Sequence, residues 1–210
     1  MDETNPWLRV SSADYEGHMG PGCADQLAPL ATVFGEVLRL LRPARVALLG
    51  CATGNGLEHV DIAVTRQLLA VDVNPAYVDA TRARHSRLGP ALSATFADLE
   101  KWPLPAGAFD LVHAALVLEH VNPDLVVPNL AQAVAPGGHA SVVLQLPSAS
   151  TNAITPSPVA SIMALEPTFH LIAPETLTER MRAAGLALER ASTVPLKNGK
   201  ALYVGVFTRQ

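Results

Sequence analysis

A glycine-rich turn and a single acid are the residues of this chain whose types and spacing can hold a small polar ligand. The turn, Gly50-Cys51-Ala52-Thr53-Gly54, follows the apolar run 46–49. Gly50 and Gly54 can adopt a positive φ, and they place no side chain between the backbone and a ligand. The acid is Asp72, which ends the next apolar run about 20 residues after the turn. An acid at the tip of the second strand of such a unit can bind the hydroxyls of a ribose.

The glycine turn differs from two common phosphate-binding loops. A dinucleotide fingerprint, G-x-G-x-x-G, starting at Gly50 would require glycine at 52 and 55, where this chain has Ala52 and Asn55. These residues count against an NAD-dependent oxidoreductase, which stays open as an alternative. A P-loop would require a Gly-Lys-Ser or Gly-Lys-Thr run, which the chain lacks. The turn fits the pattern G-x-G-x-G with Ala52 at the middle glycine.

Alternating strands and helices are the elements that must position these residues. Apolar runs predict strands over 46–49, 68–72, 91–97, 109–115, 140–146, 186–194 and 201–208. Helical spacing and helix-start residues predict helices over 27–41, 57–64, 75–88, 122–134 and 174–185. We expect an irregular arm over 1–23 and an excursion rich in Pro, Ser and Thr over 147–173. The alternation, closed by an Asn198-Gly199 hairpin turn, predicts an α/β fold with a doubly wound, mainly parallel sheet.

Composition and charge exclude several classes of protein. With 210 residues, 49% of them apolar and 16% charged, the chain is expected to form one globular domain. A net charge of −4 and the lack of a Lys/Arg run argue against a nucleic-acid partner. Cys23 and Cys51 form no C-x-x-C pair, so neither a disulfide nor a metal site is expected. The acidic N-terminus lacks a signal-peptide core, and no apolar run approaches about 18 residues, which predicts a cytoplasmic protein without a membrane partner.

Five stretches follow one another in an order typical of one enzyme class. They are the turn Gly50–Gly56, Asp72, Phe96-Ala97-Asp98-Leu99, the run Phe109-Asp110-Leu111-Val112 continuing to Leu118-Glu119-His120-Val121, and Pro136-Gly137-Gly138. With them the chain resembles the class I, Rossmann-like, S-adenosylmethionine (SAM)-dependent methyltransferases over about residues 44–208. Asp14-Tyr15-Glu16-Gly17-His18-Met19 also resembles the segment that precedes the core in a group of small bacterial members.

The resemblance implies a fold and a division of the chain. The fold would have seven strands in the order 3-2-1-4-5-7-6, with strand 7 antiparallel and helices on both faces. A single methyltransferase domain would span 1–210, made of an N-terminal arm and helix (1–43), a SAM-binding core (44–146), a cap (147–173) and a C-terminal helix and hairpin (174–210).

The resemblance also implies where SAM, and its product S-adenosylhomocysteine (SAH), would bind. The methionine part would lie along the glycine turn, against Gly50, Cys51, Ala52, Thr53 and Gly54. The ribose would be held by Asp72, with Val73 and Asn74 beside it, and the adenine would meet Asp98 and Leu99. The sulfonium end would be lined by the residues after the fourth strand, Ala114, Ala115 and Leu116.

Methyl transfer demands little chemistry of the protein, because the sulfonium is already electrophilic and catalysis consists mainly of in-line positioning and exclusion of water. A base contributes only where the acceptor must lose a proton, and histidine suits that task near neutral pH. The candidate catalytic residues are Tyr15, His18, His120 and His170. The histidines are expected at the carboxyl edge of the sheet, and Tyr15 would hydrogen-bond the acceptor or the carboxylate of SAM.

We therefore predict an enzyme, a SAM-dependent methyltransferase that moves the methyl group to a small-molecule acceptor, with the arm and the excursion as walls of its pocket. Amino methylation of nucleic-acid bases is not expected, because no Asn/Asp-Pro-Pro-Tyr motif occurs. Members of the class often carry an acid two residues before the first glycine of the turn, where this chain has Leu48. Leu48 and Ala52 leave open a non-catalytic or degenerate SAM-binding protein. A homodimer also stays open, because the uncharged run 147–165 suits a subunit contact as well as a lid.

Overall fold

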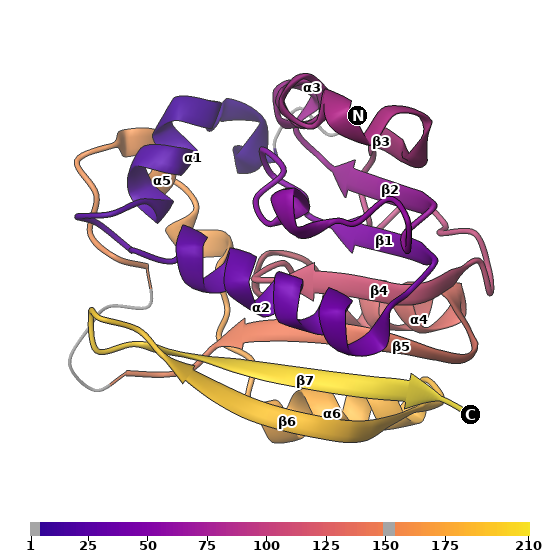
Figure 1. Ribbon diagram of the computed structural model, residues 1–210. Coiled ribbons are helices and arrows are strands. Elements are labelled where there is room, and N and C mark those ends of the chain that lie inside the picture. Colours follow the sequence, from indigo (N-terminus) through magenta and orange to yellow (C-terminus); the bar gives the residue numbers. More distant parts are fainter. Residues whose placement is uncertain (1–4, 149–153) are drawn as a thin grey trace.

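The computed structural model describes residues 5–148 and 154–210. Within these ranges the centre of the molecule is a seven-stranded sheet with helices on both faces (Figure 1). The strands are β1 (Arg45–Leu49), β2 (Gln67–Asp72), β3 (Leu92–Phe96), β4 (Phe109–Ala115), β5 (Val134–Gln145), β6 (Leu186–Pro195) and β7 (Ala201–Arg209). They lie in the order β3-β2-β1-β4-β5-β7-β6, and β7 is antiparallel to both of its neighbours. The predicted strand order is confirmed.

Helices cover both faces of the sheet. They are α1 (Ser12–Met19), α2 (Leu27–Leu41), α3 (Pro75–Arg84), α4 (Pro123–Ala133), α5 (Ala160–Met163) and α6 (Pro174–Ala183). Short 3-10 segments occur at Pro6–Arg9, Leu57–His59, Ser86–Ala91, Leu118–His120 and Glu166–Thr168. α2 crosses one face, and α4 and α6 lie on the other (Figure 1). In the part of the chain that the structure describes, no helix is both long and apolar enough to cross a membrane.

Strand β1 shows how the sheet comes to have two buried faces. Successive side chains of a strand point to opposite faces of the sheet. Val46 and Leu48 pack in the cluster formed with α2 and α3, whereas Ala47 and Leu49 pack in the cluster formed with α4 and α6. All four side chains are buried. An uninterrupted apolar run is therefore what a central parallel strand requires.

Two Asn-Pro pairs start helices as the sequence predicts. The Asn74 side chain accepts a hydrogen bond from Ala76 N–H (3.0 Å) at the start of α3, and Asn122 does the same for Asp124 N–H (3.0 Å) at the start of α4. The proline that follows each asparagine occupies a position where its missing N–H costs no helical hydrogen bond. Because α3 begins directly after β2, its cap also fixes the backbone beside Asp72.

The predicted helix over 57–64 is wrong. Only Leu57–His59 forms, as a 3-10 segment, and Val60 is already extended. Asp61 then accepts hydrogen bonds from Ala63 N–H through its side chain and from Thr65 N–H through its carbonyl. Such local bonds compete with helical ones. Leu57 and Val60 are buried although no α-helix forms, so their apolar spacing reflects burial and not helical structure.

The N-terminal arm is more regular than predicted. Residues 12–19 form α1, whose N-cap Ser11 accepts a hydrogen bond from Asp14 N–H (3.0 Å). Two other boundaries also differ from expectation. α3 ends at Arg84, and β5 begins at Val134, so that Pro136-Gly137-Gly138 lies inside the first part of the strand. Residues 1–4 of the arm and 149–153 of the excursion lie outside the described residues.

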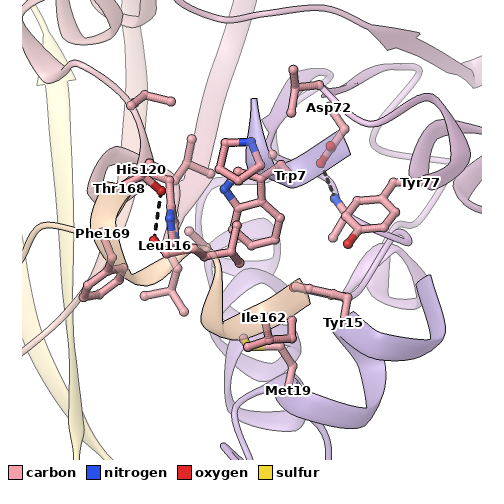
Figure 2. A pocket seen from close by; sticks show the side chains of 18 of the residues that line it. Trp7, Tyr15, Met19, Asp72, Tyr77, Leu116, His120, Ile162, Thr168 and Phe169 are labelled. Atoms are coloured by element: carbon pink, nitrogen blue, oxygen red, sulfur yellow. Dashed lines mark hydrogen bonds between the residues drawn. The ribbon is translucent and has the colours of Figure 1, made fainter. Parts of the chain in front are cut away.

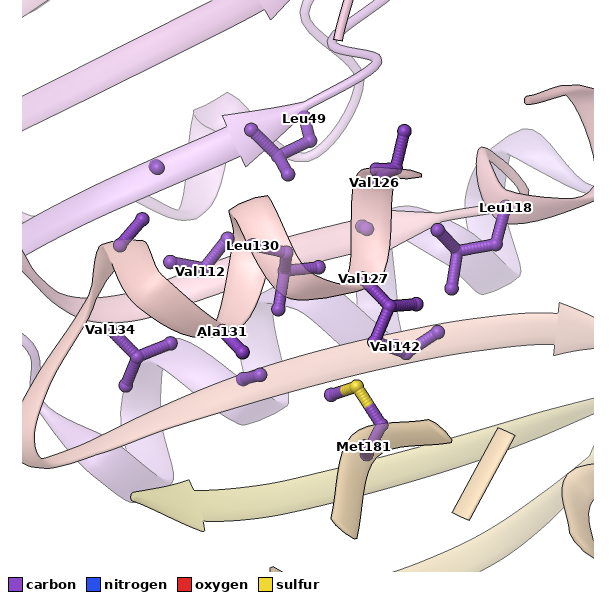
Figure 3. Packing of buried hydrophobic residues seen from close by; sticks show 14 of the residues in the cluster. Leu49, Val112, Leu118, Val126, Val127, Leu130, Ala131, Val134, Val142 and Met181 are labelled. Atoms are coloured by element: carbon purple, nitrogen blue, oxygen red, sulfur yellow. The ribbon is translucent and has the colours of Figure 1, made fainter. Parts of the chain in front are cut away.

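Leu130→Ala should lower the free energy of unfolding by about 2–5 kcal/mol. Leu130 is fully buried on the face of α4 that packs against the sheet (Figure 3), so the substitution leaves a cavity there. The measurement is chemical denaturation followed by circular dichroism. Leu125→Ala is the matched control, because Leu125 lies on the same helix and is 51% exposed. The control should change stability by less than about 0.5 kcal/mol, and equal losses for the two variants would contradict the packing described here.

Candidate functional site

A cavity of about 400 Å³ opens at the edge of the sheet where the parallel strands end. The arrowheads of β1, β2, β4 and β5 point toward α1 and α5, which lie together beyond that edge (Figure 1). The walls come from the arm, the glycine turn, the strand tips, the segment 154–169 and the residue before β7. Figure 2 shows Trp7 between the side that carries Asp72 and the side that carries His120 and Phe169. The carboxyl edge of a parallel sheet is where such folds bind ligands.

The backbone conformation and close neighbours of the glycine turn exclude larger side chains at Gly50 and Gly54. Gly50 has a positive φ of 64°, and a Cβ there would overlap the side chain of Val117. At Gly54, with φ 88°, a Cβ would lie 2.6 Å from His85 Cδ2. Ala52, which stands at the middle glycine of the expected pattern, also has a positive φ, 44°. Its methyl group is therefore accommodated by a left-handed backbone, a conformation that costs a non-glycine residue roughly 1–2 kcal/mol.

Asp72 connects this turn to the tip of β2. Its Oδ2 accepts a hydrogen bond from Ala52 N–H (2.8 Å), and its Oδ1 accepts one from Asn74 N–H (2.9 Å). Burial raises the pKa of the carboxyl to about 6, while these backbone N–H groups act in the opposite direction. Asp72 lines the cavity and is mostly ionised at neutral pH, so it presents carboxylate oxygens toward a ligand.

Eight of the predicted cofactor residues line the cavity. They are Gly50, Ala52, Asp72, Val73, Asp98, Leu99, Ala115 and Leu116. Asp98 Oδ1 accepts a hydrogen bond from Glu100 N–H (3.0 Å), and its Oδ2 lies 2.8 Å from Lys101 Nζ. Leu116, like Ala52, has a positive φ, 54°. Strained backbone of this kind clusters at functional sites.

The other predicted cofactor residues are not part of the cavity wall and make contacts behind it. Cys51 is buried, with Sγ 3.8 Å from Thr81 Oγ1, and Ala114 is fully buried in the core. Asn74 Nδ2 donates to the carbonyls of Trp7 (2.9 Å) and Val10 (3.1 Å). Gly54 lies against the His85 side chain, and the Thr53 hydroxyl donates a hydrogen bond to Glu16 of the arm. Leu48, which stands where members of the class often carry an acid, packs in the core cluster formed with α2 and α3.

The arm is fastened over the glycine turn. Thr53 Oγ1 donates to Glu16 Oε1 (2.6 Å), and the Arg84 guanidinium of α3 also bonds the Glu16 carboxylate. The Arg84 hydrogen bond holds the pKa of Glu16 below its usual value. With the Asn74 contacts to Trp7 and Val10, these bonds tie α1 and the preceding segment to both sides of the turn.

Tyr15, His18 and His120 line the cavity, whereas His170 does not. His170 is exposed, and its backbone N–H donates to Glu119 O (2.8 Å). Burial, followed by the charge of Asp72, raises the pKa of Tyr15 above its usual value. Tyr15 is therefore a protonated hydroxyl at neutral pH and can donate a hydrogen bond.

The two histidines of the cavity are both neutral at physiological pH. Burial lowers the pKa of His120 to about 4. Its ring packs edge-on against those of Trp7 and Phe169, at distances between ring centroids of 4.8 Å and 5.0 Å. Its Nδ1 has no hydrogen-bond partner among the described residues. Burial, followed by the charge of Lys200, lowers the pKa of His18, whose Nδ1 lies 3.4 Å from Cys23 Sγ. A neutral imidazole can accept a proton.

Sequence reasoning missed four polar residues at this edge: Tyr77, Glu119, Gln145 and Lys200. Glu119 is fully buried, its Oε1 accepts from Gln145 N–H (2.8 Å), and its Oε2 has no partner among the described residues. Burial raises the pKa of Glu119 to about 7. Of these four residues, Gln145 could have been found from the sequence, because it ends β5 and a polar residue at the end of a parallel strand lies at the edge where such folds bind ligands.

The sheet order and the acid at the tip of β2 define the fold of the class I SAM-dependent methyltransferases. A protein-family model described as "Methyltransferase domain" matches residues 46–138. The malonyl-[acyl-carrier protein] O-methyltransferase of Herminiimonas arsenicoxydans is 34% identical over 93 residues, which cover 42% of this chain and 32% of that protein. This chain therefore aligns with about a third of that relative's length.

Solved structures share the same fold. The N-methyltransferase NodS from Bradyrhizobium japonicum WM9 in complex with SAH has a TM-score of 0.63 at 19% identity, with 99% of this chain and 93% of that chain covered. The [4+2]-cyclase SpnF has a TM-score of 0.67 at 17% identity, with 86% of this chain and 80% of that chain covered. The chain thus has the fold of the class I SAM-dependent methyltransferases, and its residues 46–138 match the methyltransferase-domain model.

Glu119→Gln should change how stability depends on pH. The pKa of Glu119 is about 7 in the folded state and 4.5 as its ordinary value, so between these pH values the folded state holds a proton that the unfolded state has released. Wild-type stability should thus fall, relative to Glu119→Gln, as the pH rises from 4.5 through 7, by up to about 3 kcal/mol at pH 8.

The measurement is urea denaturation of both proteins at a series of pH values. Glu100→Gln is the control, since Glu100 is an exposed residue nearby, and its curve should run parallel to that of the wild-type protein. Parallel curves for wild-type and Glu119→Gln would show that Glu119 is not held protonated by burial.

Proposed function

We propose that this protein transfers a methyl group from SAM to a small-molecule acceptor by in-line displacement. The observation that supports it best is the ionised Asp72 at the cavity wall, hydrogen-bonded to Ala52 N–H of a turn whose backbone admits no side chain at Gly50. A carboxylate and a bare backbone side by side suit a ligand that carries both a ribose and an amino-acid part.

The residues of the cavity fit SAM. Asp72 would accept hydrogen bonds from the ribose hydroxyls, Asp98 would accept one from the adenine amino group, and Leu99 would contact the ring. The backbone at Gly50 and Ala52 would lie along the methionine part, with Ala115 and Leu116 at the sulfonium end. When bound, SAM supplies a methyl group on a positively charged sulfur, which is electrophilic without further activation.

The protein positions the two reactants, excludes water from them and provides a proton acceptor. Trp7, Tyr15 and Phe169 line the cavity with aromatic rings that keep water from the reacting atoms. Tyr15 donates a hydrogen bond to the acceptor or to the SAM carboxylate. Where the acceptor must lose a proton, neutral His18 or His120 takes it up. Holding the two reactants in line supplies most of the rate enhancement.

A second candidate is a SAM-binding protein that does not transfer the methyl group. The fold alone does not decide between them, because one protein of similar fold is a [4+2]-cyclase. The low pKa of His120 also favours this alternative, since a base with a pKa of about 4 accepts a proton weakly at pH 7.

The experiment that tests the proposal has two stages. Calorimetric titration with SAM, SAH and NAD should show micromolar binding of the two sulfur ligands and none of NAD. Release of SAH is then followed with a panel of small acceptors that offer oxygen, nitrogen, sulfur and carbon nucleophiles. Turnover of at least one acceptor supports methyl transfer. Binding of SAM without SAH release across the panel favours the non-catalytic alternative, and no binding of SAM or SAH contradicts both.

Asp72→Ala should weaken SAM binding by roughly 2–3 kcal/mol, or about 30- to 140-fold, because a pair of charge-assisted hydrogen bonds is lost. The measurement is the same titration on a variant shown to be folded by circular dichroism. Asp79→Ala is the control, because Asp79 lies on α3 close in sequence but its side chain is 75% exposed. It should bind SAM like the wild-type protein. Unchanged affinity in folded Asp72→Ala would remove Asp72 from the cofactor site.

A further inference from the structure

The part of the cavity beside β5 and β7 carries polar groups that the methyl transfer described above does not use. Gln145 ends β5, and Lys200 directly precedes β7. Because β7 is antiparallel to β5, its first residues lie at the same edge as the carboxyl ends of the parallel strands. β7 is four positions from β2 in the sheet, which corresponds to roughly 19 Å at a strand spacing of about 4.8 Å. Lys200 is therefore remote from Asp72, although both line the cavity.

Lys200 is the charged residue of this region. It is 4% exposed, and its Nζ donates to Gln145 Oε1 (3.3 Å) and Thr155 Oγ1 (3.0 Å). Gln145 Oε1 also accepts from Gln26 Nε2 (3.2 Å), so the ammonium group is oriented by a network from three segments of the chain. Burial lowers the pKa of Lys200, as expected for a cation held out of water. An anion beside it would favour the charged form.

Beyond this network and His18, whose pKa is lowered by burial and by the charge of Lys200, the walls around the ammonium group are apolar. Met19, Ala24 and Leu30 come from the arm and α2, and they pack in one cluster. Ile162 and Leu165 come from α5 and the residues after it, and Leu116 lies at the tip of β4. A few convergent polar groups in an apolar cavity are typical of a small-molecule site, where the polar groups fix the orientation of the ligand.

We propose that this region is the acceptor subsite, and that it takes a small molecule with an apolar body and a carboxylate that accepts a hydrogen bond from Lys200 Nζ. The inference rests on the proposed function and adds the chemical class of the acceptor. The apolar body lies between Lys200 and Leu116, so its other end faces the sulfonium end of the cofactor site. Lys200 is thus a residue that determines specificity and holds the acceptor by the end remote from the reacting atom. His18 lies near Lys200, so in this arrangement His120 is the group that takes up a proton from the acceptor.

The test measures binding, so it does not require the natural acceptor. SAH-saturated protein is titrated calorimetrically with two matched pairs of probes, benzoate with benzamide and hexanoate with hexanamide. The wild-type protein should bind each acid roughly tenfold more tightly than its amide, because the carboxylate accepts a charge-assisted hydrogen bond from the ammonium group whereas the amide oxygen is a neutral acceptor. Lys200→Met, which keeps an apolar stem and removes the ammonium group, should abolish this preference by weakening the binding of the acids more than that of the amides, and it should leave the affinity for SAH unchanged.

Lys197→Met is the matched control. Lys197 belongs to the same hairpin turn, but its side chain is 91% exposed and lies 3.5 Å from Asp25. This variant should keep the preference for acids. Lys200→Gln is a second variant that retains hydrogen-bonding capacity toward Gln145 and Thr155, and it serves if Lys200→Met does not fold.

Three results would overturn the proposal: equal affinity of the wild-type protein for acids and amides, no binding of any probe, or a preference for acids that survives both substitutions of Lys200. The titration with SAH distinguishes this failure from failure of the proposed function. A protein that binds SAH but does not prefer acids contradicts only the subsite. A protein that does not bind SAH contradicts the proposed function, and the same probes titrated without SAH still decide the subsite.

Discussion

The carboxylate of Asp72 holds the ligand edge of this molecule together. By accepting hydrogen bonds from Ala52 N–H and Asn74 N–H, it joins the turn after β1 to the start of α3. A charge-assisted bond of this kind offsets the cost of the left-handed backbone at Ala52. Asn74 in turn caps α3 and holds the carbonyls of Trp7 and Val10. One buried charge therefore organises the turn, a helix start and the N-terminal arm.

The sheet and the glycine turn at its edge could be predicted because they depend on local patterns. An apolar run such as Val46–Leu49 suits only an element buried on both faces, and Asn74-Pro75 carries its own helix start. The turn could also be recognised from the sequence, because Gly50 and Gly54 are the residue type that most easily adopts the positive φ observed at both positions. Local reasoning failed where tertiary contacts decide. The spacing of Leu57 and Val60 suggested a helix, yet only the 3-10 segment Leu57–His59 forms there, and α1 has too few apolar residues to be recognised.

The polar network at the β5 and β7 end of the cavity could not be predicted, because its contacts join distant segments. Glu119 Oε1 reaches the backbone of Gln145, 26 residues away, and Lys200 bonds the Gln145 side chain across 55 residues. Neither pairing follows from strand order alone, since several polar residues flank each strand end. The sequence likewise placed His170 at the ligand edge, and only the course of the chain after Thr168 shows that its side chain is exposed outside the cavity.

The origin of the cavity walls bears on how this protein can diverge. One side of the cavity is built from strand tips whose backbones are fixed by the core, whereas the opposite walls come from the arm, the segment 154–169 and a hairpin turn. The arm and the segment 154–169 are held to the rest of the molecule by hydrogen bonds and apolar contacts rather than by strand pairing, and the hairpin turn joins β6 to β7. Substitutions, insertions or exchanges within these segments can alter the shape and charge offered to a ligand while the sheet stays intact. New ligand preferences are thus accessible through a small, peripheral share of the chain.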